Sequence, residues 1–272
     1  MPELPEVETI KRDLQKTILG RKIIRVCVHN PAVIREPSPA VFEKSLKGLT
    51  IKNILRRGKL LILELSNGSF LTIHLKMTGQ LVLSQKLGNP GGSENSRVAF
   101  QLSGGKTLNF NDQRLFGELR LVDAWKKMKF IQGLGPEPFD LTYGGFKDML
   151  SKKKTRIKPL LMDQSFISGI GNIYAAEILF RAKINPDRSA QSLNEEEKKA
   201  LYKEIREVLK SAIKHGGSSI DDYVRLSGKQ GDYVKFHRVY GRQGQPCFVC
   251  NSIIKKITQG GRGTYFCPKC QR

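Results

Sequence analysis

Four cysteines near the end of the chain constrain its fold more than any other feature. They form two C-x2-C pairs separated by 16 residues, and their positions are Cys247, Cys250, Cys267 and Cys270. Four thiolates at this spacing suit a tetrahedral zinc ion, because each pair turns sharply enough for both sulfurs to reach one metal. An iron–sulfur or redox site is the alternative, which the close pairing disfavours. Four protein ligands leave no open position, so we expect one structural Zn²⁺ per chain.

The residues between the two pairs predict the shape of this module. IIKKI and TYF are typical of two short strands around GGRG, which places Arg262 at the tip of a β-hairpin. A rigid tip is a good place to hold a cation against a phosphate. The fifth cysteine, Cys27, alternates with apolar neighbours in IIRVCVH, and we expect it to be a buried strand residue.

The charge of the chain points to a polyanionic partner. Its 272 residues include 47 Lys and Arg against 25 Asp and Glu, a formal net charge of +22. Such a charge favours nucleic acid over an anionic membrane as the partner. No run approaches the ~20 apolar residues of a membrane span, so we expect no membrane association. The start of the chain lacks the basic and apolar regions of a secretory signal, and we expect a cytoplasmic protein.

The first half of the chain reads as one helix followed by strands. Apolar residues recur at helical spacing in Val7, Ile10, Leu14 and Ile18, after a proline that suits a helix start. From residue 22 to about residue 123 the texture changes to short runs rich in branched side chains. Two sites within it predict hairpin turns, Asn67-Gly68 and residues 103–105, and residues 87–95 resemble a flexible loop.

The second half is helical before the cysteines begin. GLGPEPFDLTYGG (133–145) has the composition of a hinge. The strongest helical pattern spans 193–215, with Ser192 and Glu195 as a predicted capping box and Gly216-Gly217 after its end. Its apolar stripe consists of Leu201, Ile205, Leu209 and Ala212.

Three motifs together carry a family resemblance. PELPEVE at the start, GIGNIYAAE (169–177) and the four-cysteine hairpin with GRGT resemble bacterial formamidopyrimidine-DNA glycosylases, which remove oxidised purines from DNA. The match runs from Pro2 to Cys270, in the family's order. It implies an α+β fold: an N-terminal β-sandwich flanked by helices, then a C-terminal helical domain with a helix–two-turns–helix element and the zinc β-hairpin. The expected partner is double-stranded DNA with oxidised bases or abasic sites, bound by a monomer in a cleft between the domains.

The resemblance also implies residue ranges for these parts. The catalytic sandwich domain would span 1–132 and the hinge 133–145. The helix–two-turns–helix domain would span 146–237, and the zinc hairpin 238–272. Within the third range, the polar stretch 216–233 matches the family's lesion-capping loop.

The catalytic roles come from the same resemblance. Pro2 would be the nucleophile, Glu3 the general acid and base for sugar-ring opening and iminium formation, and Glu6 a supporting carboxylate. Lys59 matches the active-site lysine beside the lesion, although a lysine entering a strand is more often only solvated. Arg262 completes this set. An α-amino group titrates near ~8, so a free Pro2 amine can act as a nucleophile, and we expect the active form to begin at Pro2 after removal of Met1.

Further residues are implied to hold DNA. A flipped nucleotide leaves a gap, which Met77, Arg114 and Phe116 would fill: a thioether and an aromatic ring suit insertion between bases, and Arg can hydrogen-bond the orphaned base. The alternative for Met77 is core filling, which its polar KMTG turn disfavours. The implied phosphate contacts are Lys59, His74, Asn172 and Arg262. His74 could instead be a structural histidine.

Lys158 ends the basic run SKKKTRIK (151–158), which we expect to add nonspecific DNA affinity. The alternative for this run is a solvated face.

The sequence departs from the family pattern at two places, and two rival functions remain open. Leu115 stands where many family members have a basic residue, and SENSRVAF (93–100) lacks the family's histidine-containing run. One rival is an endonuclease VIII-like glycosylase for oxidised pyrimidines, against which Leu4 and the Met77, Arg114 and Phe116 set argue. The other is a DNA-binding protein that keeps the fold and zinc without the chemistry.

Overall fold

The computed structural model describes residues 1–84, 95–220 and 223–272. The chain forms two compact units. The first comprises Met1–Gln132 and His215–Val234, and the second comprises Gly133–Lys214 and Lys235–Arg272. Except for Asn95, the loop predicted over 87–95 lies outside the described residues.

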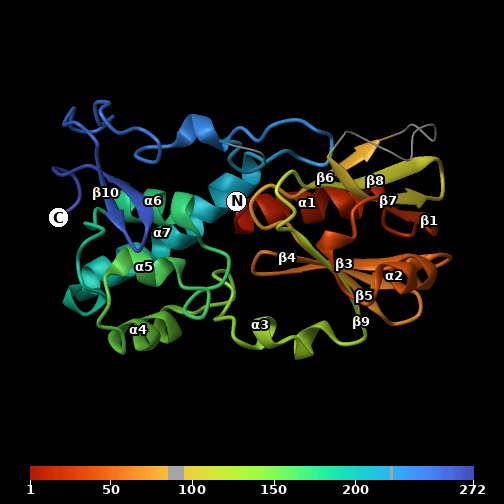
Figure 1. Cartoon of the computed structure of the whole chain (residues 1–272). Helices are drawn as coiled ribbons and strands as arrows, with labels where there is room; N and C mark the ends of the chain where they lie inside the picture. The colour runs from red at the N-terminus through yellow and green to blue at the C-terminus, as the bar shows by residue number, and fades with distance from the viewer. Residues whose placement is uncertain (85–94, 221–222) are drawn as a thin grey trace. The chain divides into compact units, whose positions relative to one another are not determined.

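The first unit is a β-sandwich (Figure 1). One sheet has the order β1-β7-β8-β6, and the other has the order β2-β9-β5-β4-β3. β2 and β9 pair in parallel, and the other described pairs of these sheets are antiparallel. The strands are β1 (Ile23–Val28), β2 (Ile34–Glu36), β3 (Ile51–Arg57), β4 (Leu60–Leu65), β5 (Phe70–His74), β6 (Gln80–Ser84), β7 (Ser96–Leu102), β8 (Lys106–Asn111) and β9 (Glu118–Val122). The predicted α+β sandwich class is confirmed.

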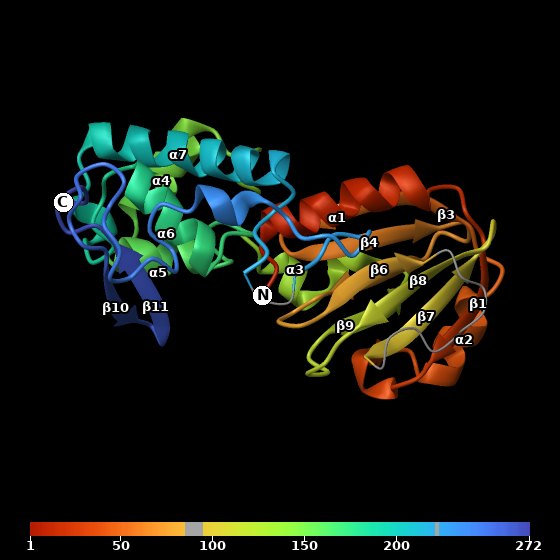
Figure 2. The same ribbon diagram turned by 90° about the horizontal axis from the view of Figure 1, so that it is seen from above.

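Helices flank the sandwich at its edge strands. α1 (Leu4–Thr17) packs against β3, and α2 (Pro39–Leu46) packs against β1 (Figure 2). The predicted apolar stripe of α1 is confirmed, because Val7, Ile10 and Leu14 are all fully buried in one core with side chains from both sheets. Short helical segments η1 (Pro31–Val33), η2 (Trp125–Lys127) and α3 (Lys129–Gln132) complete the connections of this unit.

Both predicted hairpin turns are confirmed. Asn67 and Gly68 join the antiparallel strands β4 and β5, and residues 103–105 join β7 and β8. Strand β3, by contrast, was not recognised in the sequence. Its basic residues are exposed (Lys52) or half-buried (Arg56 and Arg57), and they interrupt the run of apolar residues. Cys27 lies in β1 opposite Ala99, but it is half-buried rather than buried.

The second unit is mainly helical. The helix α6 (Asn172–Arg181) packs against α5 (Ile157–Met162), α7 (Glu195–Lys214) and the strand β11 (Arg262–Phe266), and α4 (Tyr143–Ser151) packs against α7. The buried side chains include Phe146, Phe166 and Tyr174, with the whole predicted stripe of α7. The helices are α4 (Tyr143–Ser151), α5 (Ile157–Met162), α6 (Asn172–Arg181) and α7 (Glu195–Lys214), with η3 (Ala190–Ser192) before α7 and η4 (Tyr233–Phe236) after residue 232.

The capping box predicted for α7 is wrong by two residues. Ser192 lies in η3, where its hydroxyl donates to Ser189 O. The helix begins at Glu195, so Asn194 caps it: Asn194 Oδ1 accepts the backbone N–H of Glu197, and Glu197 Oε2 accepts that of Asn194, each at 2.9 Å. The predicted pair (Ser192 and Glu195) and the observed pair (Asn194 and Glu197) both have an acidic residue three positions after a polar one. The sequence alone therefore does not distinguish between them.

The zinc module is the predicted hairpin. β10 (Lys255–Gln259) pairs antiparallel with β11 (Arg262–Phe266), and Gln259 lies opposite Arg262 at the turn. Cys247 and Cys267 share a small core with Ala176 and Phe180 of α6. The module is therefore attached to a helix of the second unit through apolar packing.

The assignment of residues 215–234 differs from the sequence-based expectation, which grouped them with the helical region. They belong to the first unit, where Tyr223 and Leu226 join the core of the sandwich. Leu83 in β6 also donates its backbone N–H to Leu226 O at 2.9 Å. The four-part division by residue ranges remains a prediction.

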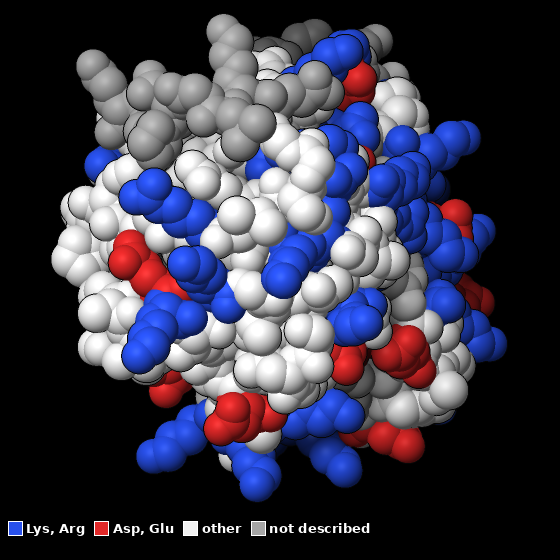
Figure 3. Space-filling model, turned by 90° about the vertical axis from the view of Figure 1, so that its right-hand side faces the viewer, with Lys and Arg blue, Asp and Glu red and all other residues white. Residues whose placement is uncertain are grey.

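Lys and Arg side chains are spread over the face of the molecule in Figure 3, with fewer Asp and Glu between them. Among the described residues, no helix combines the length and apolar character that a membrane span requires.

Candidate functional site

The start of α1 holds the predicted catalytic carboxylates in a fixed arrangement. Pro2 and Glu3 are buried, and Glu3 is the N-cap of the helix. Glu6 Oε2 accepts the backbone N–H of Glu3 at 2.8 Å, while the Glu3 carboxylate accepts the backbone N–H of Glu6. This reciprocal capping box satisfies two helix donors and fixes both side chains beside Pro2.

The second oxygen of Glu6 reaches a distant part of the chain. Glu6 Oε1 accepts the backbone N–H of Ser218 at 2.8 Å. The neighbouring Gly217 has φ +81°, and a Cβ there would lie 2.8 Å from Glu6 Oε1. A side chain at this position would therefore displace the carboxylate. Part of the predicted lesion-capping loop, residues 216–219, thus lies directly against the N-terminal end of α1.

The same loop is tied to α1 a second time. Arg225 donates to both carboxylate oxygens of Asp13, at 3.0 and 3.2 Å. Hydrogen bonding to Asp13, together with the charge of that carboxylate, raises the pKa of Arg225 above its usual value. Asp221 and Asp222 of this loop lie outside the described residues.

Lys59 lies in the tight turn between β3 and β4 and is 9% exposed. The turn is held from α1: Arg56 Nη1 donates to Gly58 O at 2.8 Å, and Arg56 Nε donates to Glu8 Oε2 at 3.0 Å. Glu8 was not identified from the sequence. Its spacing from Glu6 in PELPEVE, with basic residues at Lys11 and Arg12, was the available signal.

His74 ends β5, and its ring is a neutral hydrogen-bond donor. Burial, with the nearby positive charges of Lys76 and Lys59, lowers the pKa of His74 to about 4, although Glu118 acts in the opposite direction. Nδ1 accepts the backbone N–H of Lys76 at 3.0 Å. The proton of the neutral ring is therefore on Nε2, which can donate to a phosphate oxygen.

The three predicted gap-filling residues are brought together on two loops. Met77 is 37% exposed and Phe116 is 47% exposed. Arg114 connects them: its Nη1 lies 4.0 Å from Met77 Sδ, and its guanidinium carbon lies 4.8 Å from the centre of the Phe116 ring. Large apolar side chains presented in this way suit insertion between bases.

A second group of predicted DNA contacts assembles in the other unit. Lys158 is 1% exposed, so the solvated-face alternative is wrong for this residue. Its Nζ donates to Asn172 Oδ1 at 2.6 Å and to Thr264 Oγ1 at 2.8 Å. It therefore joins the first residue of α6 to β11, next to the exposed Arg262. Since Asn172 Oδ1 accepts from Lys158, its Nδ2 can donate to a phosphate at the helix N-terminus.

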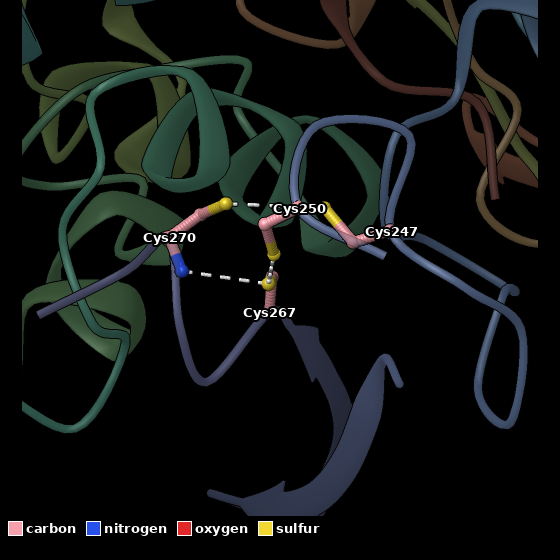
Figure 4. A group of neighbouring side chains, drawn as sticks. All are labelled: Cys247, Cys250, Cys267 and Cys270. Atoms are coloured by element: carbon pink, nitrogen blue, oxygen red, sulfur yellow. Dashed lines mark hydrogen bonds between the residues drawn. The ribbon is translucent and has the colours of Figure 1, made fainter. Parts of the chain in front are cut away.

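The four cysteines have the geometry of a metal site (Figure 4). All four sulfurs lie within 4.8 Å of one another, with separations of 3.4 Å between Cys250 and Cys267 and 3.9 Å between Cys247 and Cys270. Tetrahedral Zn–S bonds of ≈ 2.3 Å place sulfurs about 3.8 Å apart, so the residues fit one Zn²⁺. The ion is structural, as predicted, because the four thiolates complete its coordination.

The two groups of site residues belong to different units. Pro2, Glu3, Glu6, Lys59, His74 and the loops of Met77, Arg114 and Phe116 lie in the first unit, whereas Lys158, Asn172, Arg262 and the cysteines lie in the second. Sequence reasoning missed Asp112, a fully buried acid beside Arg114. Asn-Asp before a loop is a turn signal that could have drawn attention to it.

Comparison with known families gives three matches along the chain. Residues 1–119 match the formamidopyrimidine-DNA glycosylase N-terminal domain, and residues 134–224 match the formamidopyrimidine-DNA glycosylase H2TH domain. Residues 244–272 match the zinc finger found in FPG and IleRS. These matches cover most of the chain.

Curated relatives and solved structures agree with these matches. The formamidopyrimidine-DNA glycosylase of Pelotomaculum thermopropionicum is 44% identical, covering 100% of this chain and 99% of the relative, and that of Bacillus cereus is 40% identical with the same coverage. Lactococcus lactis Fpg in a complex with abasic-site DNA is 36% identical, with a TM-score of 0.91 and 99% of each chain covered. The Fpg protein of Thermus thermophilus is 39% identical, with a TM-score of 0.88, covering 99% of this chain and 98% of that one. A further Lactococcus lactis complex contains Fapy-dG DNA.

Proposed function

The chain belongs to the formamidopyrimidine-DNA glycosylase family, and we propose that it excises oxidised purines from duplex DNA and then cleaves the abasic strand. This places it in base excision repair in the bacterial cytoplasm. The observation that carries the proposal is the capping box at the start of α1, which holds Glu3 and Glu6 beside Pro2 and against residues 216–219.

The first step is covalent catalysis by the N-terminal amine. With Met1 removed, the lone pair of the Pro2 nitrogen forms a bond to C1′ of the damaged nucleotide, and the glycosidic electron pair leaves with the base. The nitrogen then loses its N–H proton, which balances the proton that the departing base takes up. Protonation of the ring oxygen O4′ opens the sugar and leaves an iminium between Pro2 and C1′. Glu3 would donate the proton to O4′ and, as the resulting carboxylate, would then be able to act as a base.

The iminium then permits strand cleavage. It withdraws electrons from C1′ and acidifies the C2′ hydrogen, so loss of that proton expels the 3′ phosphate by β-elimination. A second elimination expels the 5′ phosphate. Water finally hydrolyses the iminium, which regenerates the free amine of Pro2.

Two groups of side chains would hold the DNA during this reaction. Lys59 and His74 supply a cation and a neutral donor from the sandwich, and Asn172 and Arg262 supply donors from the second unit. The damaged base must leave the helix, at a cost of a few kcal/mol, and Met77, Arg114 and Phe116 would occupy its place. Described residues of the loop 216–233 border the carboxylate end of this site through Glu6.

Borohydride trapping tests the mechanism directly. Incubation with an 8-oxoguanine duplex and sodium borohydride should reduce the iminium and give one covalent protein–DNA adduct, mapped to Pro2 by mass spectrometry. A protein that keeps Met1 should give none, and Pro5→Ala is the matched control that keeps the adduct. Lack of trapping by intact protein starting at Pro2 would favour the non-catalytic binder.

A second assay decides the substrate class. Excision of 8-oxoguanine and of thymine glycol should be compared in otherwise identical duplexes. We expect faster excision of 8-oxoguanine, and a preference for thymine glycol would favour the endonuclease VIII-like function.

A further inference from the structure

The topology of the sandwich brings two loops side by side. Residues 75–79 connect β5 to β6, and residues 112–117 connect β8 to β9. Since β5 pairs with β9 and β6 pairs with β8, both loops cross between the two sheets at the same place. The register confirms this, because His74 pairs with Glu118 and Gln80 pairs with Asn111. One loop carries Met77, and the other carries Arg114 and Phe116.

A single buried carboxylate joins these loops. Asp112 is 0% exposed, and its Oδ1 accepts a hydrogen bond from the hydroxyl of Thr78, one residue after Met77. The same oxygen accepts the backbone N–H of Arg114 at 3.2 Å. Its Oδ2 accepts the backbone N–H of Gly117 at 2.6 Å. Asp112 therefore contacts one loop through Thr78 and closes its own loop at both ends of the Arg114–Phe116 segment.

Both loops contain strained backbone next to the exposed side chains. Lys76, before Met77, has φ +52°, and Leu115, between Arg114 and Phe116, has φ +60°. Such angles are unfavourable for these residue types and persist where surrounding contacts over-determine them. Asp112 provides such contacts on both sides of Leu115, through the backbone N–H groups of Arg114 and Gly117. Gly117 also lacks room for a side chain, because a Cβ there would overlap the Phe110 ring and lie 2.9 Å from Asp112 Oδ2.

We propose that Asp112, through Thr78, is the positioning residue that holds Met77, Arg114 and Phe116 as one preorganised wedge for displacing a stacked base. The inference rests on the proposed function, in which these three side chains fill the gap left by the lesion. Because Asp112 is fully buried, its role is to position other residues and not to take part in the chemistry. It orders both loops before DNA binds, so the entropic cost of ordering them is not added to the cost of displacing the base.

This role predicts a selective defect. Asp112→Asn replaces one acceptor oxygen by an NH₂ group that faces a backbone or hydroxyl donor, which loosens the wedge. Single-turnover excision of 8-oxoguanine from duplex DNA should slow by about tenfold or more. Cleavage of a duplex with a preformed abasic site, where no base has to be displaced, should stay within about twofold of the wild type on the same scale.

A milder variant and a matched control keep the test decisive if Asp112→Asn folds poorly. Thr78→Val removes only the hydroxyl between the loops and should show the same selective loss. Thr72→Val makes the same change at another buried threonine, on β5, and should alter neither rate. The double variant should be slowed by less than the product of the two single effects, because both changes remove the bond between Thr78 and Asp112.

The outcomes separate this inference from the proposed function. Equal losses on both substrates in the Asp112 and Thr78 variants, or no loss on either, would overturn the positioning role. A wild-type protein that acts on neither substrate would refute the proposed function itself.

Discussion

Ser218 donates its backbone N–H to Glu6 Oε1, while the other oxygen of that carboxylate accepts the backbone N–H of Glu3, both at 2.8 Å. One side chain thus fixes the beginning of the first helix and the segment that follows the last residues of α7. Both bonds are buried.

Glu6→Gln should break this connection. An amide presents one acceptor oxygen, so one backbone N–H is left unsatisfied in a buried place, and we expect a loss of about 1–3 kcal/mol in the free energy of unfolding. Hydrogen exchange at Ser218 should accelerate. Urea unfolding and exchange mass spectrometry check this, with the exposed Glu36→Gln as control. Unchanged protection of residues 216–219 would contradict the prediction.

Glu8→Gln should reduce the sensitivity of the fold to acid. Burial alone would raise the pKa of Glu8, but hydrogen bonds from Lys11, Arg56 and Arg12 bring it below the usual value. A lowered folded-state pKa means that this carboxylate stabilises the protein above pH 4.5 and loses its contribution as the pH falls below that value. The wild type should therefore lose more stability than Glu8→Gln between neutral and acid pH. Parallel denaturation curves measure the difference.

His74 should produce a second pH dependence at higher pH. Its folded-state pKa of about 4 lies below the usual 6.5, so protonation favours the unfolded chain. Stability is retained above about pH 6.5 and falls as the pH drops toward 4, by up to roughly 3 kcal/mol for this group. His74→Gln should remove that part of the decline. The ring resonances followed by NMR should show no protonation near pH 6.5, and a midpoint there would disprove the assignment.

Arg262→Gln should weaken DNA binding without changing the preference between DNA sequences. A phosphate contact carries no base information, so the slope of log K against log salt should become shallower by about 0.9. Fluorescence anisotropy at several salt concentrations gives this slope. Lys255→Gln, at the base of the same hairpin, is the matched control and should leave the slope nearly unchanged.

Cys267→Ser should release the zinc and unfold the hairpin. Metal ligation contributes on the order of 10 kcal/mol to such modules. Metal analysis should find one zinc per chain in the wild type and none in this variant. Cys27→Ser, which removes the cysteine outside the cluster, should keep the zinc. Equal zinc content in the wild type and Cys267→Ser would refute the ligand assignment.

Local patterns in the sequence predicted much of this fold. The branched residues of β4 and β5, the turn at Asn67-Gly68 and the spacing of the four cysteines are local signals, and the structure has both strands, the turn and the cysteine cluster. The apolar stripes of α1 and α7 are also local patterns, because residues at helical spacing lie on one face of a helix, and both stripes are buried.

Features that depend on distant residues were not predictable in this way. Tyr223 and Leu226 enter the core of the sandwich because β6 and α1 offer them partners that lie far away in sequence. Asp112 and Glu177 are polar residues in buried positions, and Glu177 satisfies the backbone N–H groups of three residues, 238–240. Only the folded chain shows which donors such carboxylates meet.

The bond between Glu6 and Ser218 has a consequence for the order of events during synthesis, because 212 positions separate the two residues. At ~5–20 residues per second, a ribosome needs roughly 10–40 s to supply the second partner after the first. Throughout that interval the Glu6 carboxylate lacks the backbone N–H of Ser218 as a partner. The first helix can therefore form early with its own capping box, but the buried carboxylate at its start gains its bond to Ser218 only late in synthesis.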